Sequence, residues 1–221
     1  MRILACAAAL TTLLTVNAHA DCRASLVTGL DVSASISPDE IRMQLGGMSD
    51  ALQSPAVLSA FRSQGCVNIS VYLWSDGSPV LLLPWTTVAS EADAQAATAA
   101  LMAAAESNTA KPGALTNVGE ALQFAEALLG QIPPTGRQII NIVSNGESNA
   151  GPSVPAISER LRLSGITVNA VLFGPSATIE DWYRSHVTGG YGSFVLRVHG
   201  ADDFAAVYRS KFVLDLSMVT Q

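Results

Sequence analysis

The stretch Leu30-Asp31-Val32-Ser33-Ala34-Ser35 closes an apolar run that begins at Ser25, and it places one carboxylate and two hydroxyls at alternate positions. A short apolar run that ends in polar turn residues is typical of a buried strand in a parallel sheet. At the carboxyl edge of such a sheet, these three polar side chains would converge on a small oxygen-lined cup. Hard divalent cations such as Mg²⁺ prefer oxygen ligands. The stretch therefore predicts a parallel sheet with a cation site at its edge.

Apolar runs alternate with helical patterns along the rest of the chain, which predicts βαβ units with helices on both faces of a central sheet. Strands are expected at 25–31, 67–74, 80–88, 137–144, 166–173 and 193–198, and helices at 38–53, 91–106, 117–129, 154–163, 179–187 and 202–216. Asp76-Gly77 is a hairpin signal, so the strand that follows it should run antiparallel. The predicted fold is α/β: a doubly wound, mostly parallel six-stranded sheet with one antiparallel hairpin strand.

Residues 1–20 have the pattern of a signal peptide, with Arg2 ahead of an apolar run and Ala18-His19-Ala20 as a small-residue cleavage site. The apolar run is too short to span a bilayer, and no later run is apolar for long enough to do so. We therefore expect a periplasmic or secreted protein, with one domain over residues 23–218.

The chain is acidic, with 18 Asp and Glu against 12 Lys and Arg, and one of those basic residues is Arg2 of the predicted signal peptide. Binding to nucleic acid or to an anionic membrane requires a basic face. The composition therefore argues against both kinds of partner.

Several motifs of catalysis and nucleotide binding are missing from the sequence. It contains no Gly-x-Ser-x-Gly elbow, no Walker-type loop and no Gly-x-Gly-x-x-Gly fingerprint. His186 and His199 lie far apart and have no companion at zinc-ligand spacing. These absences give no support to a serine hydrolase, a nucleotide-binding protein or a zinc protein.

Cys22 and Cys66 each stand just ahead of a predicted strand. If those strands are parallel neighbours, both thiols lie at the same edge of the sheet, and an oxidising compartment would favour a disulfide between them. The alternative is that they are two unrelated small core residues, because a disulfide has a short reach.

Three loops should meet at the carboxyl edge of the sheet, where ligands of doubly wound folds collect. They are 31–35, 113–117 and 144–149. Asn149, with Gly151 just after it, could line the rim of this region. The alternative is that both residues serve as ordinary turn formers.

These loops together resemble the metal-ion-dependent adhesion site of von Willebrand factor type A domains, which combines Asp-x-Ser-x-Ser, a distant Thr and a later Asp. The matching positions are Asp31, Ser33, Ser35, Thr116 and Asn145. Similarity to a bacterial exported subfamily, defined only as a domain of unknown function, lies in Trp74-Ser75, Pro84-Trp85-Thr86, residues 189–195 and the terminal helix. The resemblance covers nearly all of residues 23–218 and implies a von Willebrand A-like, Rossmann-like fold.

The resemblance implies that Ser33, Ser35 and Thr116 hold Mg²⁺ through hydroxyl oxygens, while Asp31 and the fifth residue hold bound waters. Mn²⁺ or Ca²⁺ could take the same place. Such a site leaves the cation undercompensated, so an Asp or Glu of a protein partner can complete its coordination. The implied function is recognition, without a chemical step.

Asn145 departs from the family pattern, because an amide replaces the usual carboxylate and removes one negative charge near the cation. This change should weaken metal binding in the empty protein and leave a bound ion more electrophilic toward an incoming carboxylate. Glu147 could compensate if the loop folds it inward; otherwise it is a solvated side chain. Ala34, where the family often has Gly, is a smaller departure.

The sequence thus predicts an exported protein-binding module that recognises an acidic residue through a divalent cation, and not an enzyme. One alternative is a degenerate domain of the same fold that binds its partner without metal. The other is a metal-assisted hydrolase, which would need a general base beside the ion. Asp31 and Glu147 are the candidates for such a base in the neighbouring sequence.

Overall fold

A computed structural model describes residues 22–107, 113–174 and 176–217. The predicted signal peptide, residues 1–20, lies outside the described residues. Six strands form the sheet in the described part of the chain: β1 (Ala24–Asp31), β2 (Val67–Trp74), β3 (Val80–Val88), β4 (Arg137–Ser144), β5 (Thr167–Phe173) and β6 (Val195–Val198). Their spatial order is β3-β2-β1-β4-β5-β6. The β2–β3 pair is antiparallel and the other pairs are parallel, so the predicted fold class is confirmed.

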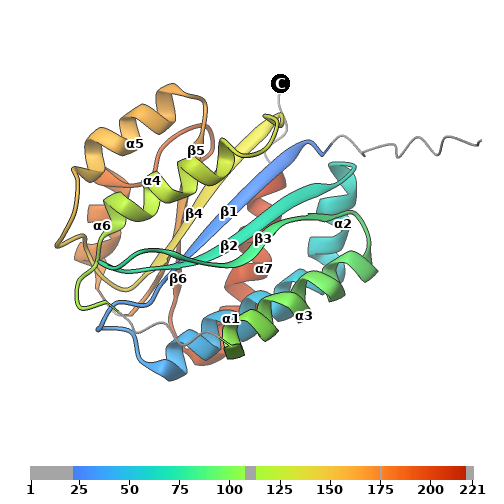
Figure 1. The fold of residues 1–221 in the computed structure, drawn as a ribbon, viewed down its shortest axis with the longest axis horizontal. Coiled ribbons are helices and arrows are strands. Elements are labelled where there is room, and N and C mark those ends of the chain that lie inside the picture. The colour runs from blue at the N-terminus through green and yellow to red at the C-terminus, as the bar shows by residue number, and fades with distance from the viewer. Residues whose placement is uncertain (1–21, 108–112, 175, 218–221) are drawn as a thin grey trace, which may run out of the picture.

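Helices cover both faces of the sheet (Figure 1). One face carries α1 (Pro38–Leu52), α2 (Pro55–Ser63), α3 (Glu91–Ser107) and α7 (Phe204–Ser217). The other carries α4 (Val118–Leu129), α5 (Val154–Leu163) and α6 (Ala177–His186). The sheet therefore lies between two hydrophobic cores, one for each group of helices.

The sequence prediction missed α2. It has its own start signal, because the Ser54 hydroxyl accepts a hydrogen bond from the Val57 amide and Pro55 occupies the first helical position. Val57, Leu58 and Phe61 turn inward to the core shared with α7. The other predicted helices and strands are present, with ends that differ by one or a few residues.

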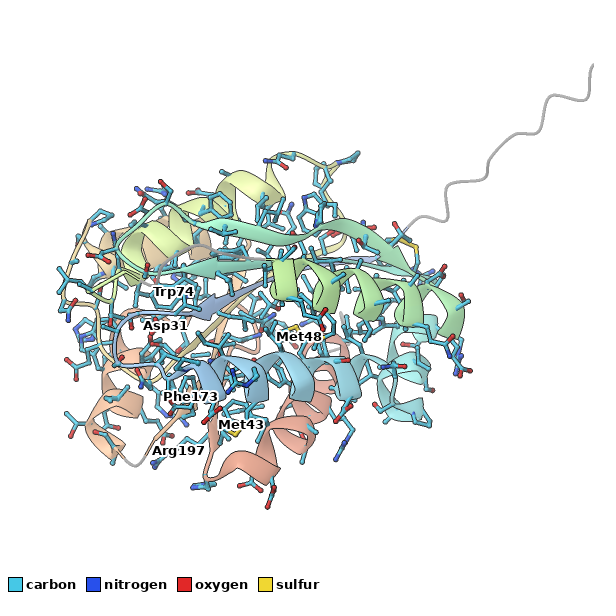
Figure 2. All side chains as sticks on the ribbon, turned by 60° about the horizontal axis from the view of Figure 1, so that its bottom comes forward. Asp31, Met43, Met48, Trp74, Phe173 and Arg197 are labelled. Carbon is cyan, nitrogen blue, oxygen red and sulfur yellow. A yellow bond between two sulfur atoms is a disulfide. The ribbon has the colours of Figure 1, made fainter. Side chains whose placement is uncertain are left out.

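The doubly wound topology fixes where a site can form. Strand β1 is buried along its whole length and lies between β2 and β4, so the chain order reverses at the β1–β4 pair. Ligand sites of open α/β sheets lie at such a point, beyond the carboxyl ends of the strands. Asp31 pairs with Trp74 at the ends of β1 and β2, and Figure 2 shows the two labelled side chains close together there.

The disulfide lies at the other end of the strands, where β1 and β2 begin. Cys22 and Cys66 precede β1 and β2, which are parallel neighbours, and their sulfur atoms are bonded. The disulfide predicted from the sequence is therefore confirmed. It ties the start of β1 to the start of β2, at the end of the sheet away from Asp31.

A row of polar side chains crosses the middle of the sheet on the face that α7 covers. Thr28, Asn141 and Asn169 stand in register on the adjacent strands β1, β4 and β5. All three are buried beneath α7. Lys211 and Asp215, which belong to that helix, are buried with them. We call these five residues the polar seam.

Hydrogen bonds and one ion pair connect the polar seam. Lys211 Nζ lies 3.0 Å from Asp215 Oδ2 and donates to Thr28 Oγ1. Asp215 also accepts hydrogen bonds from the side-chain amides of Asn141 and Asn169. The polar seam therefore fixes α7 against the three central strands.

Candidate metal centre

Asp31 forms the floor of the candidate site at the end of β1. Its side chain is fully buried, and both carboxylate oxygens accept short hydrogen bonds. Oδ1 accepts from the Ser33 amide at 2.7 Å, and Oδ2 accepts from the Ser144 hydroxyl at 2.6 Å. These bonds hold the carboxylate in one orientation below the loop that follows β1.

Three hydroxyls lie above this floor. Ser33 Oγ is 3.2 Å from Ser35 Oγ, and Thr116 Oγ1 donates to Ser33 Oγ at 3.3 Å. Ser33 and Thr116 are buried and Ser35 is exposed. Hydroxyl oxygens from two loops far apart in the sequence thus meet at one point, as the sequence predicted.

Asn145 closes the group from the third loop. Its Oδ1 accepts a hydrogen bond from Ser35 Oγ at 2.9 Å, and its Nδ2 donates to the Ser35 carbonyl at 3.2 Å. Both ends of the amide are therefore engaged by one residue of the first loop. Together Asp31, Ser33, Ser35, Thr116 and Asn145 form what we call the cup.

Several residues outside the predicted set position the cup. Ser144, the last residue of β4, holds Asp31 and also accepts from the Gly146 amide. Tyr183 of α6 is buried and donates its hydroxyl to the Gly146 carbonyl at 3.1 Å. Burial raises the pKa of Tyr183 well above its ordinary value, so it remains a hydrogen-bond donor. A serine at a strand end and a helical tyrosine carry no local signal of this role.

The loop with Thr116 is fastened to the loop after β4. Asn149 Oδ1 accepts from the Thr116 amide, and the Asn149 amide donates to the Thr116 carbonyl, both at 2.9 Å. The Ser148 hydroxyl donates to the same carbonyl. Asn149 therefore places Thr116 at the cup, a role that neither sequence interpretation of Asn149 included.

Electrostatics favour a cation in the cup. Burial raises the pKa of Asp31 above its ordinary value, while hydrogen bonds from Ser144 and Ser33 oppose that rise. A buried carboxylate that is short of compensation gains from a nearby positive charge. Glu147, which the sequence offered as a second carboxylate, is exposed.

The donor set fits a small hard cation. It consists of three hydroxyl oxygens, one amide oxygen and one carboxylate. All of these are hard oxygen ligands, the type that Mg²⁺ prefers. Among the described residues, no three His, Cys, Asp or Glu side chains group together as metal ligands. A metal centre in this part of the chain would thus rely on neutral oxygens with a single carboxylate.

A family model described as "Protein of unknown function (DUF1194)" matches residues 21–220. The chain belongs to this family. The match covers the whole described domain of this DUF1194 protein, including the three loops of the cup. No curated protein sequence matches the chain.

Solved structures with the same fold are von Willebrand A domains. Proximal thread matrix protein 1 from the mussel byssus is 18% identical with a TM-score of 0.62, over 90% of this chain and 48% of that chain. A structure of the same mussel protein with a zinc-occupied MIDAS motif is 16% identical with a TM-score of 0.62, over 90% and 47% of the two chains.

Two bacterial structures are also similar. A von Willebrand factor type A protein from Catenulispora acidiphila is 14% identical, with a TM-score of 0.61 over 87% of this chain and 42% of that chain. The open pilus adhesin SpaC from Lactobacillus rhamnosus GG is 11% identical, with a TM-score of 0.61 over 86% and 30%. The DUF1194 chain thus spans about half or less of these proteins. At these identities the likeness shows a von Willebrand A-like fold.

Proposed function

We propose that this DUF1194 protein is a binding module that recognises an Asp or Glu of a protein partner through a divalent cation, Mg²⁺ or alternatively Mn²⁺ or Ca²⁺. Asp31, Ser33, Ser35, Thr116 and Asn145 would hold the cation. The observation that carries the proposal is the hydrogen-bonded group of three hydroxyls from two separate loops, directly above a buried carboxylate. The module acts by binding and needs no chemical step.

The residues of the cup have two different roles. The hydroxyls of Ser33, Ser35 and Thr116 supply neutral oxygens, while Asp31 supplies a fixed negative charge below them. A bound cation would offer an open coordination position to a carboxylate oxygen of the partner. Because Ser35 is exposed, a partner's side chain can reach the cup from solvent.

Two further observations support this proposal. Similar folds occur in a mussel protein solved with a zinc-occupied MIDAS motif and in a pilus adhesin. The disulfide suits an oxidising compartment, which fits the proposed export to the periplasm or the medium. In the described residues, no helix has the length and apolar character that a membrane span requires.

Calorimetric titration with Mg²⁺ and Mn²⁺, in buffer that contains acetate as a probe carboxylate, tests the proposal. Thr116→Val removes the hydroxyl that donates to Ser33 and keeps the shape of the side chain. We expect the variant to bind metal at least about tenfold more weakly, a loss of about 1.4 kcal/mol. Thr86→Val, a similar change in β3 away from the cup, should bind as the native protein does.

This titration, together with a capture assay and a turnover assay, separates the alternatives. If the native protein takes up no Mg²⁺ or Mn²⁺ at millimolar concentration with acetate present, the metal-dependent mechanism is wrong. Partner capture that persists in EDTA would then indicate a metal-independent interaction domain. Turnover of phosphate or carboxylate esters that requires metal would instead indicate a hydrolase.

A further inference from the structure

The polar seam holds an amine, an amide and a carboxyl group in direct contact. Lys211, Asp215 and Asn141 are all buried, and one oxygen atom joins the other two side chains. Asp215 Oδ2 lies 3.0 Å from Lys211 Nζ and accepts a hydrogen bond from Asn141 Nδ2 at 3.3 Å. The amine of a lysine and the side-chain amide of an asparagine can condense with loss of ammonia. The polar seam therefore contains the reactants of a covalent cross-link.

The register of the strands also places the amine beside the amide. Thr28 and Asn141 are paired on β1 and β4, and Lys211 Nζ donates to Thr28 Oγ1 at 3.3 Å. The amine is therefore held over two neighbouring strand positions, between the Thr28 hydroxyl and the carboxylate to which Asn141 donates. Groups that a fold holds side by side react far faster than the same groups free in solution.

The two asparagines of the polar seam are held differently. Asn169 donates to the other carboxylate oxygen, Asp215 Oδ1, at 2.9 Å, and its own Oδ1 accepts from the Phe194 amide. Asn141 lacks such an anchor, because its buried Oδ1 has no hydrogen-bond partner in the described part of the chain. Asn169 thus fixes the carboxylate, whereas Asn141 shares Oδ2 with the amine and has an unengaged carbonyl.

We propose that Lys211 and Asn141 form an isopeptide bond, a self-catalysed modification that ties α7 covalently to β4. Lys211 Nζ attacks Asn141 Cγ and forms a new N–C bond, and the bond between Cγ and Nδ2 breaks. Asp215 Oδ2 accepts a proton from the attacking Nζ and gives a proton to the leaving Nδ2, which departs as ammonia. The products are one secondary amide and one ammonia, and no oxidant or water is consumed.

The ion pair makes this reaction slow. Only a neutral amine is a nucleophile, so a proton must pass from Lys211 to Asp215 before the attack. Burial favours the transfer, because it lowers the pKa of Lys211 and raises the pKa of Asp215, while the attraction between the two charges opposes both shifts. Freshly folded protein therefore keeps the ion pair, and unfolding measurements of that pair require fresh protein. The cross-link accumulates with time because ammonia departs.

Mass spectrometry of the purified protein, sampled during incubation below its unfolding temperature, tests the proposal. We expect the intact mass to fall by one ammonia. After digestion with trypsin, residues 138–160 and 210–221 should appear as one linked peptide, because trypsin does not cleave after an acylated lysine. Succinimide formation at Asn145-Gly146 would also release ammonia. Fragment ions that place the link at Asn141 therefore decide the result.

Two lysine variants provide a matched pair. Lys211→Met removes the nucleophile, and Lys111→Met makes the same change at the other lysine of the sequence. We expect no linked peptide from Lys211→Met and native accumulation of the linked peptide in Lys111→Met. Asp215→Ala, incubated at a temperature at which it is folded, should form the link at least about a hundredfold more slowly, as expected for loss of a general acid and base.

Several results would overturn the proposal. One is native protein that keeps its full mass and is still cleaved after Lys211 at the end of the incubation. Another is a link from Lys211 to Asn169, carried by residues 163–184, because Asn141 would then be the wrong electrophile. Link formation at the native rate in Asp215→Ala would rule out proton transfer through the carboxylate. These results are independent of the cup, whose function the metal titration tests separately.

Discussion

At the scale of single residues, the position of the cup depends on a close contact between Gly151 and Asn117. Gly151 has a φ of +83°, and a Cβ built there would lie 1.8 Å from Asn117 Oδ1. That oxygen caps α4 by accepting a hydrogen bond from the Glu120 amide. Asn117 directly follows Thr116, so Gly151 allows the loop with Thr116 to pack against the loop after β4.

We predict that Gly151→Ala lowers the free energy of unfolding by about 2–3 kcal/mol, because the left-handed backbone is strained by a side chain and the cap of α4 is displaced. Gly165→Ala is the control, since Gly165 has a φ of +77° and no atom lies within 4 Å of its built Cβ. It should cost only the backbone strain, about 1–2 kcal/mol. Urea unfolding of both variants checks the difference. Equal losses would mean that the contact with Asn117 does not matter.

The cup's own residues could be predicted from sequence because each has a distinctive type at a strand end or before a helix. Asp31, Ser33 and Ser35 follow one strand, and Thr116 precedes the cap of α4. The residues that support them could not be predicted. Ser144 and Tyr183 become part of the site only when β4 and α6 pack beside β1, and nothing in the local sequence specifies those contacts.

At the scale of elements, the docking of α7 depends on the polar seam. Burial raises the pKa of Asp215 and lowers the pKa of Lys211, and in each case the ion pair opposes the shift. Breaking a buried pair is costly because the remaining charge stays in the protein interior. The two partners are not equivalent, since Asp215 also accepts from two asparagine amides, whereas Lys211 donates to the Thr28 hydroxyl and lies over the Phe212 ring.

We therefore expect Asp215→Ala to lower the free energy of unfolding by about 3–5 kcal/mol, because it leaves a buried ammonium and two amides without their acceptor. Lys211→Met should cost less, since both amides still donate to Asp215. Chemical denaturation at neutral pH provides the comparison. A larger loss in Lys211→Met would contradict this account of the polar seam.

The Lys211→Met deficit should also depend on pH. A raised folded-state pKa means that the contribution of Asp215 to stability is present below its unfolded pKa and is lost as the pH rises through its folded pKa. Lys211 lowers the pKa of Asp215, so Lys211→Met raises that pKa further and enlarges the loss of stability at neutral pH. The stability difference from the native protein should therefore shrink as the pH falls toward the ordinary Asp pKa, in unfolding curves recorded across that range. A constant difference would argue against a charged Asp215.

Most elements could be predicted because apolar period and capping signals agree, as they do at the first helix, where Ser37 and Glu40 form a capping box. The exception is α2. Only Gln53 and Ser54 separate it from α1, and its start signal, Ser54 followed by Pro55, is equally the pattern of a turn that ends α1. Its docking on α7, through the edge-on contact of Phe61 with Phe212, is tertiary and could not be predicted from local sequence.

At the scale of the whole molecule, the disulfide and the cup lie at opposite ends of the strands. The Cys22–Cys66 disulfide closes a loop of 44 residues at the edge where β1 and β2 begin, whereas the cup lies where β1 and β4 end. We predict that Cys22→Ala combined with Cys66→Ala lowers the free energy of unfolding by about 2–4 kcal/mol. Metal affinity in acetate should remain native at temperatures where the variant is folded. A loss of affinity in the folded variant would show that the two edges are coupled.

The most direct test of the metal centre is anomalous diffraction from crystals grown with Mn²⁺ and acetate. We expect a manganese peak in the cup, bounded by the hydroxyl oxygens of Ser33, Ser35 and Thr116, with an acetate oxygen on its solvent side. Ordered crystals with no manganese in the cup, or with these hydroxyls turned away from it, would contradict the central claim.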